Sequence, residues 1–525
     1  MTNGRRRTAP LSAQRAPLAA ALLALATTAC GPSASTEWPG GAGASDTSAS
    51  DTSASSTVDP IERDGDQRRV RNVLLVVVDT LRADRLGCYG YGRATPNVDG
   101  LAARGTLFLE NRAQGSWTRP SMLSLMTGTY VDDSYVRPSA TAALLAPVLA
   151  ERGLETAAFV ANGVLGRHSG LDRGFETYDV RPDVGYRGDQ LARRFEQWLA
   201  RTDRGRGWFA WVHFMDPHHP YDPLPDDDVF TASGTRPYLD EIAPRWREAW
   251  GRIARRNPAY DVDVLETAVT GMIADSNRYD GEVRAVDRAI GSLVRELEVR
   301  GVADETLIVL ASDHGELLYE YDDYPVRMSS VGRKLGPEAD RFRERFTIGH
   351  TGWQYREILH TPLVVVGPGF DAGARVEERT ENVDVYPTIL AALGVEPPAP
   401  LDGRALQERG GEPRDYTYAY GRGAASIEAP DGWKLVSHPI GRYGEDEPTL
   451  ELLAGQVGAA APVDLAAQHP DRVAELERRL DAWRARVEFP GELGESDVDR
   501  EVLEQLGYVP TDDEFAGPGD GADGD

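Results

Sequence analysis

The sequence predicts an α/β fold: a large, mostly parallel β-sheet sandwiched by helices, with a small C-terminal α+β subdomain. Continuous β-branched runs such as VLLVVVD (73–79) are typical of strands that are buried on both faces. Helical stretches separate these runs, and such an alternation predicts a parallel sheet that is covered on both sides. From about residue 412 the apolar runs become short and strand-like, which predicts the small subdomain.

The elements of the large sheet follow in chain order. Strands are predicted at 73–79, 155–161, 208–214, 306–313 and 362–367, and helices at 98–105, 141–153, 189–202 and 281–301. In such sheets, ligands gather at the carboxyl ends of the strands. Asp79 and Asp313 each stand where a buried strand ends, so both are candidate functional residues.

The C-terminal part is predicted to form a subdomain that packs on the main sheet. Three strand-like pieces, YTYAYGRGAASIEAP, DGWKLVSH and LELLAG, precede a helix at 469–487. We therefore expect the main domain at 69–411 and the subdomain at 412–510.

The first 30 residues have the pattern of an export signal. Four arginines, Arg5, Arg6, Arg7 and Arg15, precede an apolar run at 16–29 that is too short to span a bilayer. The residues around Cys30 resemble a bacterial lipoprotein processing site, with Cys30 as the acylated first residue of the mature chain. The expected location is the bacterial cell envelope, with the protein exported and lipid-anchored; an ordinary cleaved signal is the alternative.

The end segments and the overall charge limit the possible partners. Residues 31–68 are rich in Gly, Ala, Ser and Thr, which predicts a disordered tether, and residues 511–525 form an acidic tail. The net charge of −27 argues against nucleic acid as a partner, because neutralising phosphates needs clustered Lys and Arg. Two cysteines allow no disulfide framework.

Four groups of motifs resemble a known family. They are VVVDTLRADRLGCYGYGRATPNVDGLAARG (76–105), SWTRPSMLSLMTG (116–128), VHFMDPHHPYDP (212–223), and SDHGE (312–316) with IGHTGWQYREILHTPLVV (348–365). Together they resemble the sulfatase family of the alkaline phosphatase superfamily, from about Asn72 to the segment at 381–394. The resemblance implies the large sheet and an ester hydrolase.

The resemblance implies one divalent metal ion, held by Asp79, Asp313, His314 and the Thr118 oxygen. Most sulfatases carry a second aspartate directly after the first, and this chain has Thr80 there. Carboxylate oxygens with an imidazole suit Mn²⁺, Zn²⁺ or Mg²⁺ better than Ca²⁺. A site with two zinc ions is the alternative.

Thr118 occupies the position at which sulfatases have a Cys or Ser that is converted to formylglycine. Threonine is no substrate for that conversion, and Met122 replaces the arginine that supports the aldehyde hydrate, so no formylglycine is expected. Phosphodiesterase and phosphoglycerol-transferase relatives use an unmodified threonine here, which implies a Thr118 nucleophile activated by the bound cation. Pro120 fits a helix start that would point its positive end at an anion. Thr118 or Ser121 as a plain N-cap is the alternative.

Two histidines are expected to be catalytic. By the same resemblance, His218 in DPHHPYDP and His350 in GHTGWQYRE contact the transferred group or the leaving oxygen. Imidazole suits that role because its pKa lies near neutral pH. His219 is the neighbouring alternative to His218 and a candidate for substrate binding, as is Arg119, which faces either the anion or solvent.

Other conspicuous residues have structural interpretations. Arg82 and Asp84 are expected to pair and to anchor the loop after the first strand. Asp287 is expected to cap or brace a helix, and Cys88 to be a buried apolar side chain. The sequence assigns no role to five further histidines: His168, His213, His360, His438 and His469.

The leading hypothesis is a metal-dependent hydrolase of phosphate or sulfate esters that works through a covalent Thr118 intermediate. The missing Cys and Arg favour phosphate or phosphonate esters. Its substrates would be small-molecule, glycan or lipid esters, selected by the loops at 224–275 and 319–347, with membrane contact only through the N-terminal lipid anchor. Two alternatives remain: a cell-envelope phosphotransferase, although such relatives carry transmembrane helices ahead of this domain, and a non-catalytic homologue that binds anionic glycans.

Overall fold

The large sheet of the computed structural model has eight strands in the order β11-β2-β10-β7-β1-β6-β4-β5. Their bounds are β1 Asn72–Val78, β2 Thr106–Arg112, β4 Glu155–Val160, β5 Thr177–Val180, β6 Trp208–Phe214, β7 Thr306–Ser312, β10 Leu363–Val366 and β11 Ala374–Glu381. Strand β10 pairs antiparallel with both of its neighbours, and the other pairings in this sheet are parallel. The prediction of a mostly parallel sheet is therefore confirmed.

The structure describes only part of the chain. The described residues are 70–131, 136–138, 141–181, 187–203, 205–233, 262–320, 348–350, 352–408, 414–421, 423–438, 448–454, 463–487 and 491–493. The expected signal peptide, tether and acidic tail lie outside these residues, as does most of the two loops expected to select the substrate. No helix among the described residues combines the length and the apolar character needed to cross a bilayer.

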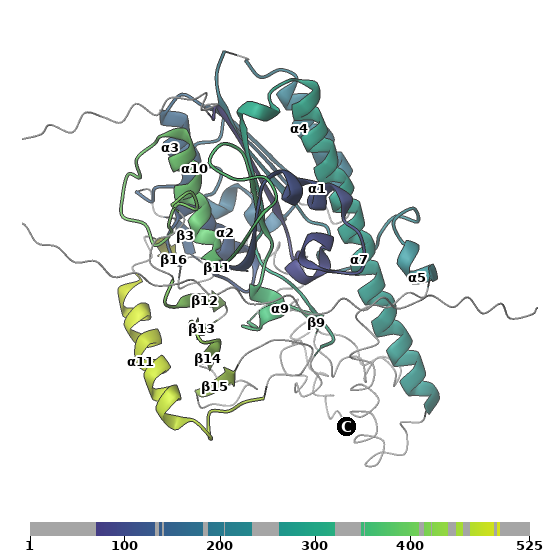
Figure 1. Ribbon diagram of the computed structural model, residues 1–525, viewed down its shortest axis with the longest axis vertical. Helices are drawn as coiled ribbons and strands as arrows, with labels where there is room; N and C mark the ends of the chain where they lie inside the picture. Colours follow the sequence, from purple (N-terminus) through teal and green to yellow (C-terminus); the bar gives the residue numbers. More distant parts are fainter. Residues whose placement is uncertain are drawn as a thin grey trace, which may run out of the picture. The chain divides into compact units, whose positions relative to one another are not determined.

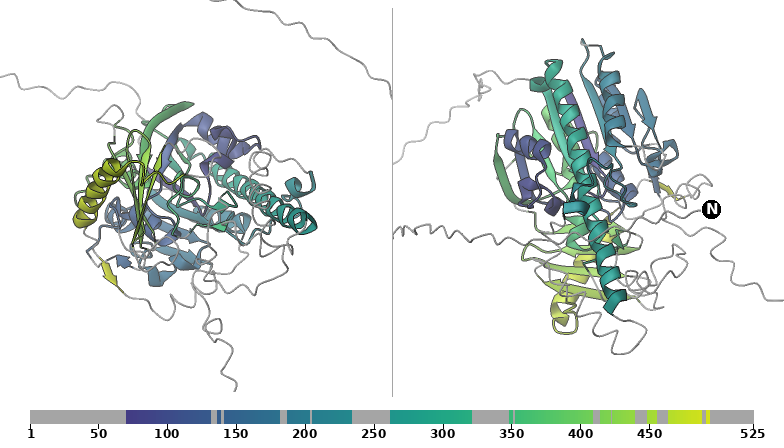
Figure 2. Two further views of the ribbon diagram at one scale, coloured as in Figure 1. Left: turned by 90° about the horizontal axis from the view of Figure 1, so that it is seen from below. Right: turned by 90° about the vertical axis from the view of Figure 1, so that its right-hand side faces the viewer.

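Helices cover both faces of the large sheet (Figures 1 and 2). Helices α1 Pro96–Arg104, α4 Gly188–Leu199 and α7 Val262–Val299 pack on one face. Helices α2 Thr118–Thr127, α3 Leu145–Glu151 and α10 Val385–Leu393 pack on the other. Strand side chains alternate between these two cores, and this explains why the central strands are apolar at nearly every position.

The C-terminal strands form an antiparallel sheet in the order β12-β13-β14-β15. The strands are β12 Thr417–Gly421, β13 Ala424–Glu428, β14 Trp433–His438 and β15 Thr449–Ala454. Helix α11 Pro470–Arg486 packs on one face of this sheet through Leu476, Leu480 and Trp483. The other face packs against Trp353 and Tyr355, which lead into α9 Arg356–Leu359, so the predicted short strands and the helix are confirmed.

Short elements complete the described fold. They are β3 Val136–Pro138 paired with β16 Gly491–Leu493, β8 Leu317–Leu318 paired with β9 Ile348–Gly349, and the short helix α5 Val229–Ser233.

Asp287 caps a helix, as the sequence predicts. It projects from α7 to the start of α1, where its Oδ1 accepts hydrogen bonds from the backbone N–H groups of Val98 at 2.8 Å and Asn97 at 3.1 Å. Its Oδ2 accepts one from Asn97 Nδ2 at 2.7 Å. The carboxylate therefore satisfies amides that a helix leaves without partners at its N-terminus.

We expect Asp287→Ala to lower the free energy of unfolding by about 1–3 kcal/mol, because buried amides lose a charged acceptor. Urea unfolding of both proteins measures the difference. Asp287→Asn keeps an acceptor oxygen and should lose less. Equal stability of the alanine variant and the wild type would contradict the capping role.

Candidate active site

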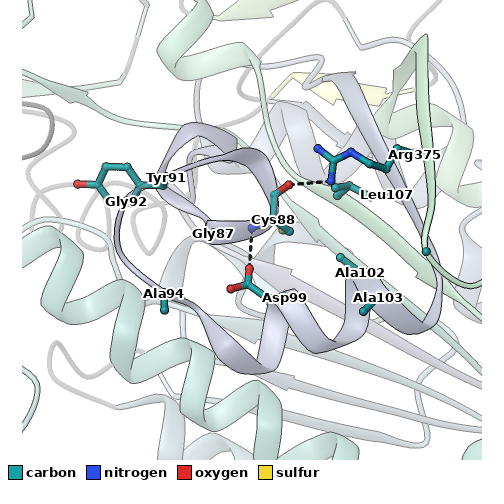
Figure 3. Close-up of a pocket in the computed structure, with 11 residues that line it drawn as sticks. Gly87, Cys88, Tyr91, Gly92, Ala94, Asp99, Ala102, Ala103, Leu107 and Arg375 are labelled. Atoms are coloured by element: carbon teal, nitrogen blue, oxygen red, sulfur yellow. Dashed lines mark hydrogen bonds between the residues drawn. The ribbon is translucent and has the colours of Figure 1, made fainter. Parts of the chain in front are cut away.

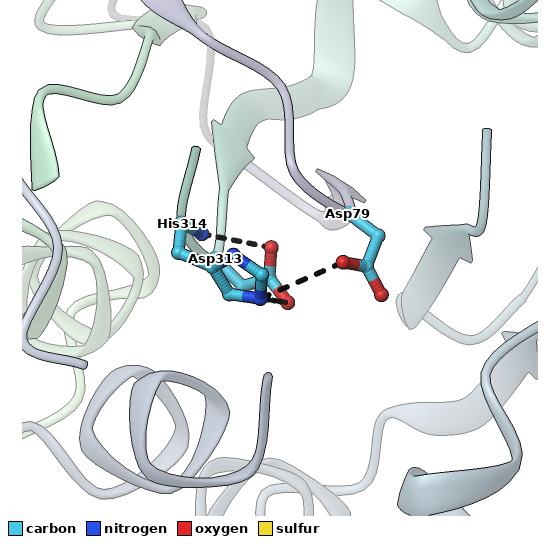
Figure 4. Close-up of side chains that lie close together, drawn as sticks. All are labelled: Asp79, Asp313 and His314. Atoms are coloured by element: carbon cyan, nitrogen blue, oxygen red, sulfur yellow. Dashed lines mark hydrogen bonds and ion pairs between the residues drawn. The ribbon is translucent and has the colours of Figure 1, made fainter. Parts of the chain in front are cut away.

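The carboxyl ends of β1 and β7 bring two carboxylates together (Figure 4). Val78 is in register with Ser312, so Asp79 and Asp313 follow adjacent parallel strands at the same level. His314 Nε2 lies 3.6 Å from Asp79 Oδ1 and 3.4 Å from Asp313 Oδ2. All three side chains are fully buried. These residues form the one group of potential metal ligands found among the described residues.

Thr118 meets this group from the start of α2. Its Oγ1 lies 3.4 Å from His314 Nε2 and 3.4 Å from Asp79 Oδ2. The N-cap of α2 is Trp117, which caps with no side-chain hydrogen bond. Ser121 Oγ donates to the carbonyl of Gly115 at 2.9 Å. The interpretation of Thr118 or Ser121 as a plain N-cap is therefore wrong, and the Thr118 hydroxyl lies at the positive end of the helix.

The loop before Thr118 forms backbone hydrogen bonds with strand β12 of the C-terminal sheet. Tyr420 N donates to Gln114 O at 2.8 Å, and Ser116 N donates to Tyr420 O at 3.2 Å. A Cβ at Gly421 would lie 2.0 Å from Ser116 Oγ, so the close approach of the two segments requires glycine there. Strand β12 thus holds the backbone that leads to the threonine.

The three residues and Thr118 suit a small divalent cation. Asp79 Oδ1 and Asp313 Oδ2 are buried and have no hydrogen-bond partner among the described residues, so a cation would satisfy both. Tetrahedral bonds of about 2.0–2.2 Å separate ligand atoms by about 3.3–3.6 Å. The distances of 3.4–3.6 Å from His314 Nε2 to Asp79 Oδ1, Asp313 Oδ2 and Thr118 Oγ1 agree with that spacing.

The two carboxyl groups differ in acidity. Burial, followed by the charge of Asp313, raises the pKa of Asp79 to about 7. Burial also opposes ionisation of Asp313, but His314 and His213 outweigh it and lower its pKa to about 2. Near neutral pH the pair therefore retains part of a proton, which a bound cation would displace.

Asn162 belongs to the site, although the sequence analysis does not single it out. Its Nδ2 donates to Asp79 Oδ2 at 2.6 Å and to Thr118 Oγ1 at 3.3 Å, and its Oδ1 accepts from Val164 N at 2.9 Å. Asn162 orients both the carboxylate and the hydroxyl. A signal for it exists, because Asn162 directly follows the predicted strand at 155–161, at the sheet edge where ligands gather.

His213 also lies at the site, whereas the sequence assigns it no role. It is fully buried on β6, and its Nε2 is 3.7 Å from Asp313 Oδ2. Its place inside the apolar run WFAWVHF makes it look like a core residue in the sequence.

The two expected catalytic histidines lie beside the metal-ligand group. The ring centroid of His350 is 4.3 Å from that of His314 and 5.2 Å from that of His218. His219 is exposed and contacts Tyr221, so the structure favours His218 over His219. Glu316 is buried with its Oε1 3.0 Å from His350 Nδ1, a partner that the sequence pattern does not reveal.

Two arginines near the site are buried. Arg119 is 1% exposed, which excludes the solvent-facing alternative, and its Nη2 donates to Val164 O at 3.4 Å. Arg82 pairs with Asp84 through bonds of 2.9 and 2.7 Å, as predicted. Arg82 also donates to Glu316 O at 3.0 Å, so this pair supports the segment that carries His314.

Cys88 faces a pocket of about 490 Å³ that none of the site residues lines (Figure 3). Burial, followed by the charge of Asp99, raises the pKa of the Cys88 thiol to about 12. The thiol therefore stays neutral at physiological pH and is a poor nucleophile. Cys88 is half-buried rather than buried as predicted, because one side of it lines the pocket.

A carboxyl pair supports the loop that carries His218. Glu282 of α7 accepts a hydrogen bond from Asp222 N at 2.8 Å, and Asp216 accepts one from Gly188 N at 2.8 Å. Burial, then the neighbouring Asp216, raises the pKa of Glu282 to about 9. Glu282 is therefore protonated at neutral pH and can donate to Asp216.

We expect Glu282→Gln to stabilise the protein increasingly as the pH rises. Between its ordinary pKa of 4.5 and the folded pKa of about 9, Glu282 keeps a proton only in the folded state, so wild-type stability falls as pH rises through this window. Glutamine cannot ionise and can still accept from Asp222 N. Thermal unfolding at pH 5 and pH 8 should show similar midpoints at pH 5 and a higher midpoint for the variant at pH 8. A variant that is less stable at pH 8 would refute a protonated Glu282.

Comparisons with known proteins find relatives of this chain in sequence and in fold. A sequence model of the family described as sulfatase matches residues 71–395. Arylsulfatase K of Bos taurus is 24% identical over 383 residues, which cover 64% of this chain and 65% of that protein. The chain thus spans slightly less than two thirds of that relative. N-acetylglucosamine-6-O-sulfatase of Bacteroides thetaiotaomicron is 22% identical over 433 residues, with 66% and 73% covered.

A solved structure shares the fold. The phosphonate monoester hydrolase of Agrobacterium radiobacter superposes with a TM-score of 0.60 and 22% sequence identity, covering 79% of this chain and 96% of that one.

Proposed function

The chain belongs to the sulfatase family, and from this premise we propose that it is a metal-dependent hydrolase of phosphate or sulfate esters with Thr118 as its nucleophile. One observation carries the proposal. The Thr118 hydroxyl lies within 3.4 Å of both Asp79 and His314, in the fully buried group that suits a cation. A threonine with a merely structural role needs no such neighbours.

The residues of the site account for both steps of the proposed reaction, the formation of a covalent threonine intermediate and its hydrolysis. The Thr118 hydroxyl loses its proton to water, and Oγ1 attacks the phosphorus or sulfur of the ester. The bond to the ester oxygen breaks, its electron pair stays on that oxygen, and His218 or His350 supplies the proton. The oxygen of a water molecule then bonds to the phosphorus or sulfur of the intermediate, and the bond to Thr118 Oγ1 breaks. A proton of that water returns to Oγ1, which restores Thr118 and releases phosphate, phosphonate or sulfate.

Asp79, Asp313, His314 and the Thr118 oxygen would hold the cation. When bound, the cation supplies positive charge that lowers the pKa of the hydroxyl and offsets charge on the transferred group. This mixture of oxygen and imidazole ligands suits Zn²⁺, Mn²⁺ or Mg²⁺ better than Ca²⁺. Asn162 donates hydrogen bonds to both Asp79 and Thr118 and would orient them for the cation.

Two features support phosphate or phosphonate esters over sulfate esters. Thr118 stands where formylglycine would be made, and Met122, at the position of the supporting arginine, is fully buried in the core under α2. The buried Arg119 is the nearest candidate to bind the anionic group of a small-molecule, glycan or lipid ester. We also propose that the chain is exported and anchored through an acylated Cys30.

A panel of matched esters tests this function. The purified protein, supplied with Zn²⁺, Mn²⁺ or Mg²⁺, is assayed against p-nitrophenyl phosphate, p-nitrophenyl phenylphosphonate and p-nitrophenyl sulfate. We expect the two phosphorus esters to have a higher kcat/KM than the sulfate. A preference for the sulfate would overturn the substrate assignment, and no turnover of any ester would favour the non-catalytic alternative.

A further inference from the structure

His213 is a fully buried histidine whose ring nitrogens lack, within the described part of the chain, the hydrogen bonds that a buried polar group normally makes. It lies on β6 in register with Val77 of β1 and Val160 of β4, between apolar neighbours, and it is fully buried. Neither of its ring nitrogens has a hydrogen-bond partner among the described residues. Leaving a buried polar group unsatisfied costs about 1–3 kcal/mol, so an otherwise apolar strand has a reason to carry His213 only if something binds it.

The ring points to the group of metal ligands. His213 Nε2 is 3.7 Å from Asp313 Oδ2, and that oxygen also lacks a hydrogen-bond partner among the described residues. This distance is too long for a hydrogen bond. It is close to the separation of about 3–4 Å between two atoms that bind one ion with bonds near 2.1 Å. His213 lies outside the group of ligand atoms that are all within 4.8 Å of one another, so its ring would have to move toward this group for Nε2 to share the ion.

The residue after Asp79 brings no carboxylate to the site. Most sulfatases have a carboxylate at this position, and this chain has Thr80, whose Oγ1 is buried without a hydrogen-bond partner among the described residues. The backbone of Thr80 has a φ of 54° and donates its N–H to Asp313 Oδ1 at 3.3 Å. Thr80 therefore orients Asp313 through its backbone and offers no carboxylate to a cation.

We propose that His213 is a further ligand of the divalent cation and supplies the site with a second imidazole. The inference rests on the proposed metal site and deepens it. The ligand set becomes two carboxylates, two imidazoles and the Thr118 oxygen. Imidazole suits zinc, copper, iron and nickel, whereas Mg²⁺ and Ca²⁺ prefer oxygen, so His213 selects a transition metal.

X-ray absorption at the zinc edge tests this by counting imidazoles, independently of activity. The full chain with one equivalent of Zn²⁺ should show two imidazoles. At saturating Zn²⁺, His213→Ala and His213→Gln should each show one. Glutamine places an amide N–H near the position of Nε2, so it preserves a contact with Asp313 but removes the imidazole. His469→Ala, an exposed histidine at the start of α11, is the matched control and should keep the count at two.

The number of imidazoles bound to zinc decides for or against the proposal. A loss of zinc affinity alone would not, because losing an outer-shell partner already weakens metal binding about 10–100-fold. One imidazole in the wild type, or two in both His213 variants, overturns the proposal. If the wild type binds no zinc at all, the proposed metal site itself is wrong, and this result is distinct from a wrong assignment of His213. Thermal unfolding of the metal-free proteins guards against misfolding: His213→Gln, which keeps most of the side-chain volume, should unfold cooperatively near the wild type, whereas His213→Ala leaves a cavity and should unfold at a lower temperature.

Discussion

Replacing Thr118 by alanine is expected to lower kcat at least about 1,000-fold, because the reaction loses its nucleophile. The carboxylates and the imidazole remain, so the variant should still bind its cation. Thr118→Ser keeps a hydroxyl and should retain more activity than the alanine variant. Steady-state kinetics with p-nitrophenyl phosphate, together with zinc titration, measures both properties.

A matched control separates chemistry from packing. Ser124 lies on the same helix, is fully buried, and its Oγ has no hydrogen-bond partner among the described residues. Ser124→Ala removes a hydroxyl from α2 and should change kcat by less than about threefold. Mass spectrometry of rapidly quenched wild type should find a phosphoryl group on Thr118. Full turnover by Thr118→Ala would exclude the hydroxyl as nucleophile.

Asp313→Asn is expected to weaken cation binding at least about 100-fold and to remove most turnover, because it takes away a negative charge and a ligand oxygen. An asparagine oxygen can still accept from the backbone of Thr80 and His314, so the strand end should keep its shape. A cation that binds only the folded protein raises its thermal midpoint. Added zinc should therefore raise the midpoint of the wild type more than that of the variant.

Asp189→Asn is the control for that experiment. Asp189 lies in the first turn of α4, half exposed, and outside the group of metal ligands. Its substitution should leave zinc affinity unchanged. If Asp313→Asn binds zinc as tightly as the wild type does, Asp313 is not a ligand.

The central strands could be predicted from the sequence because burial on both faces leaves continuous apolar runs. The edge strand β11 could not, since most of its residues, ARVEERTE, are charged and few are buried; charged side chains at a sheet edge discourage pairing with another chain. The sequence could not predict that β10 runs antiparallel to its neighbours, because an apolar run has the same pattern in either strand direction. Helix α7 begins at Val262 rather than at residue 281.

The site followed from the sequence only where its residues stand at strand ends or in motifs. Asp79, Asp313, His314 and Thr118 are of that kind, and the structure brings them together. Glu316 beside His350 depends on a contact across 34 residues of chain, which no local pattern encodes. His213 looks like a core residue in the sequence because it stands within the apolar run of β6, and that run gives no sign that its side chain faces Asp313.

The hydrogen bonds between β12 and the residues before Thr118 have a consequence for biosynthesis. Gln114 and Ser116 leave the ribosome long before Tyr420, yet Tyr420 binds both of their backbones. The loop before Thr118 therefore gains these two hydrogen bonds only after the chain has been made through β12. A chain that ended before Tyr420 would contain every proposed site residue and still lack the contacts that hold this loop.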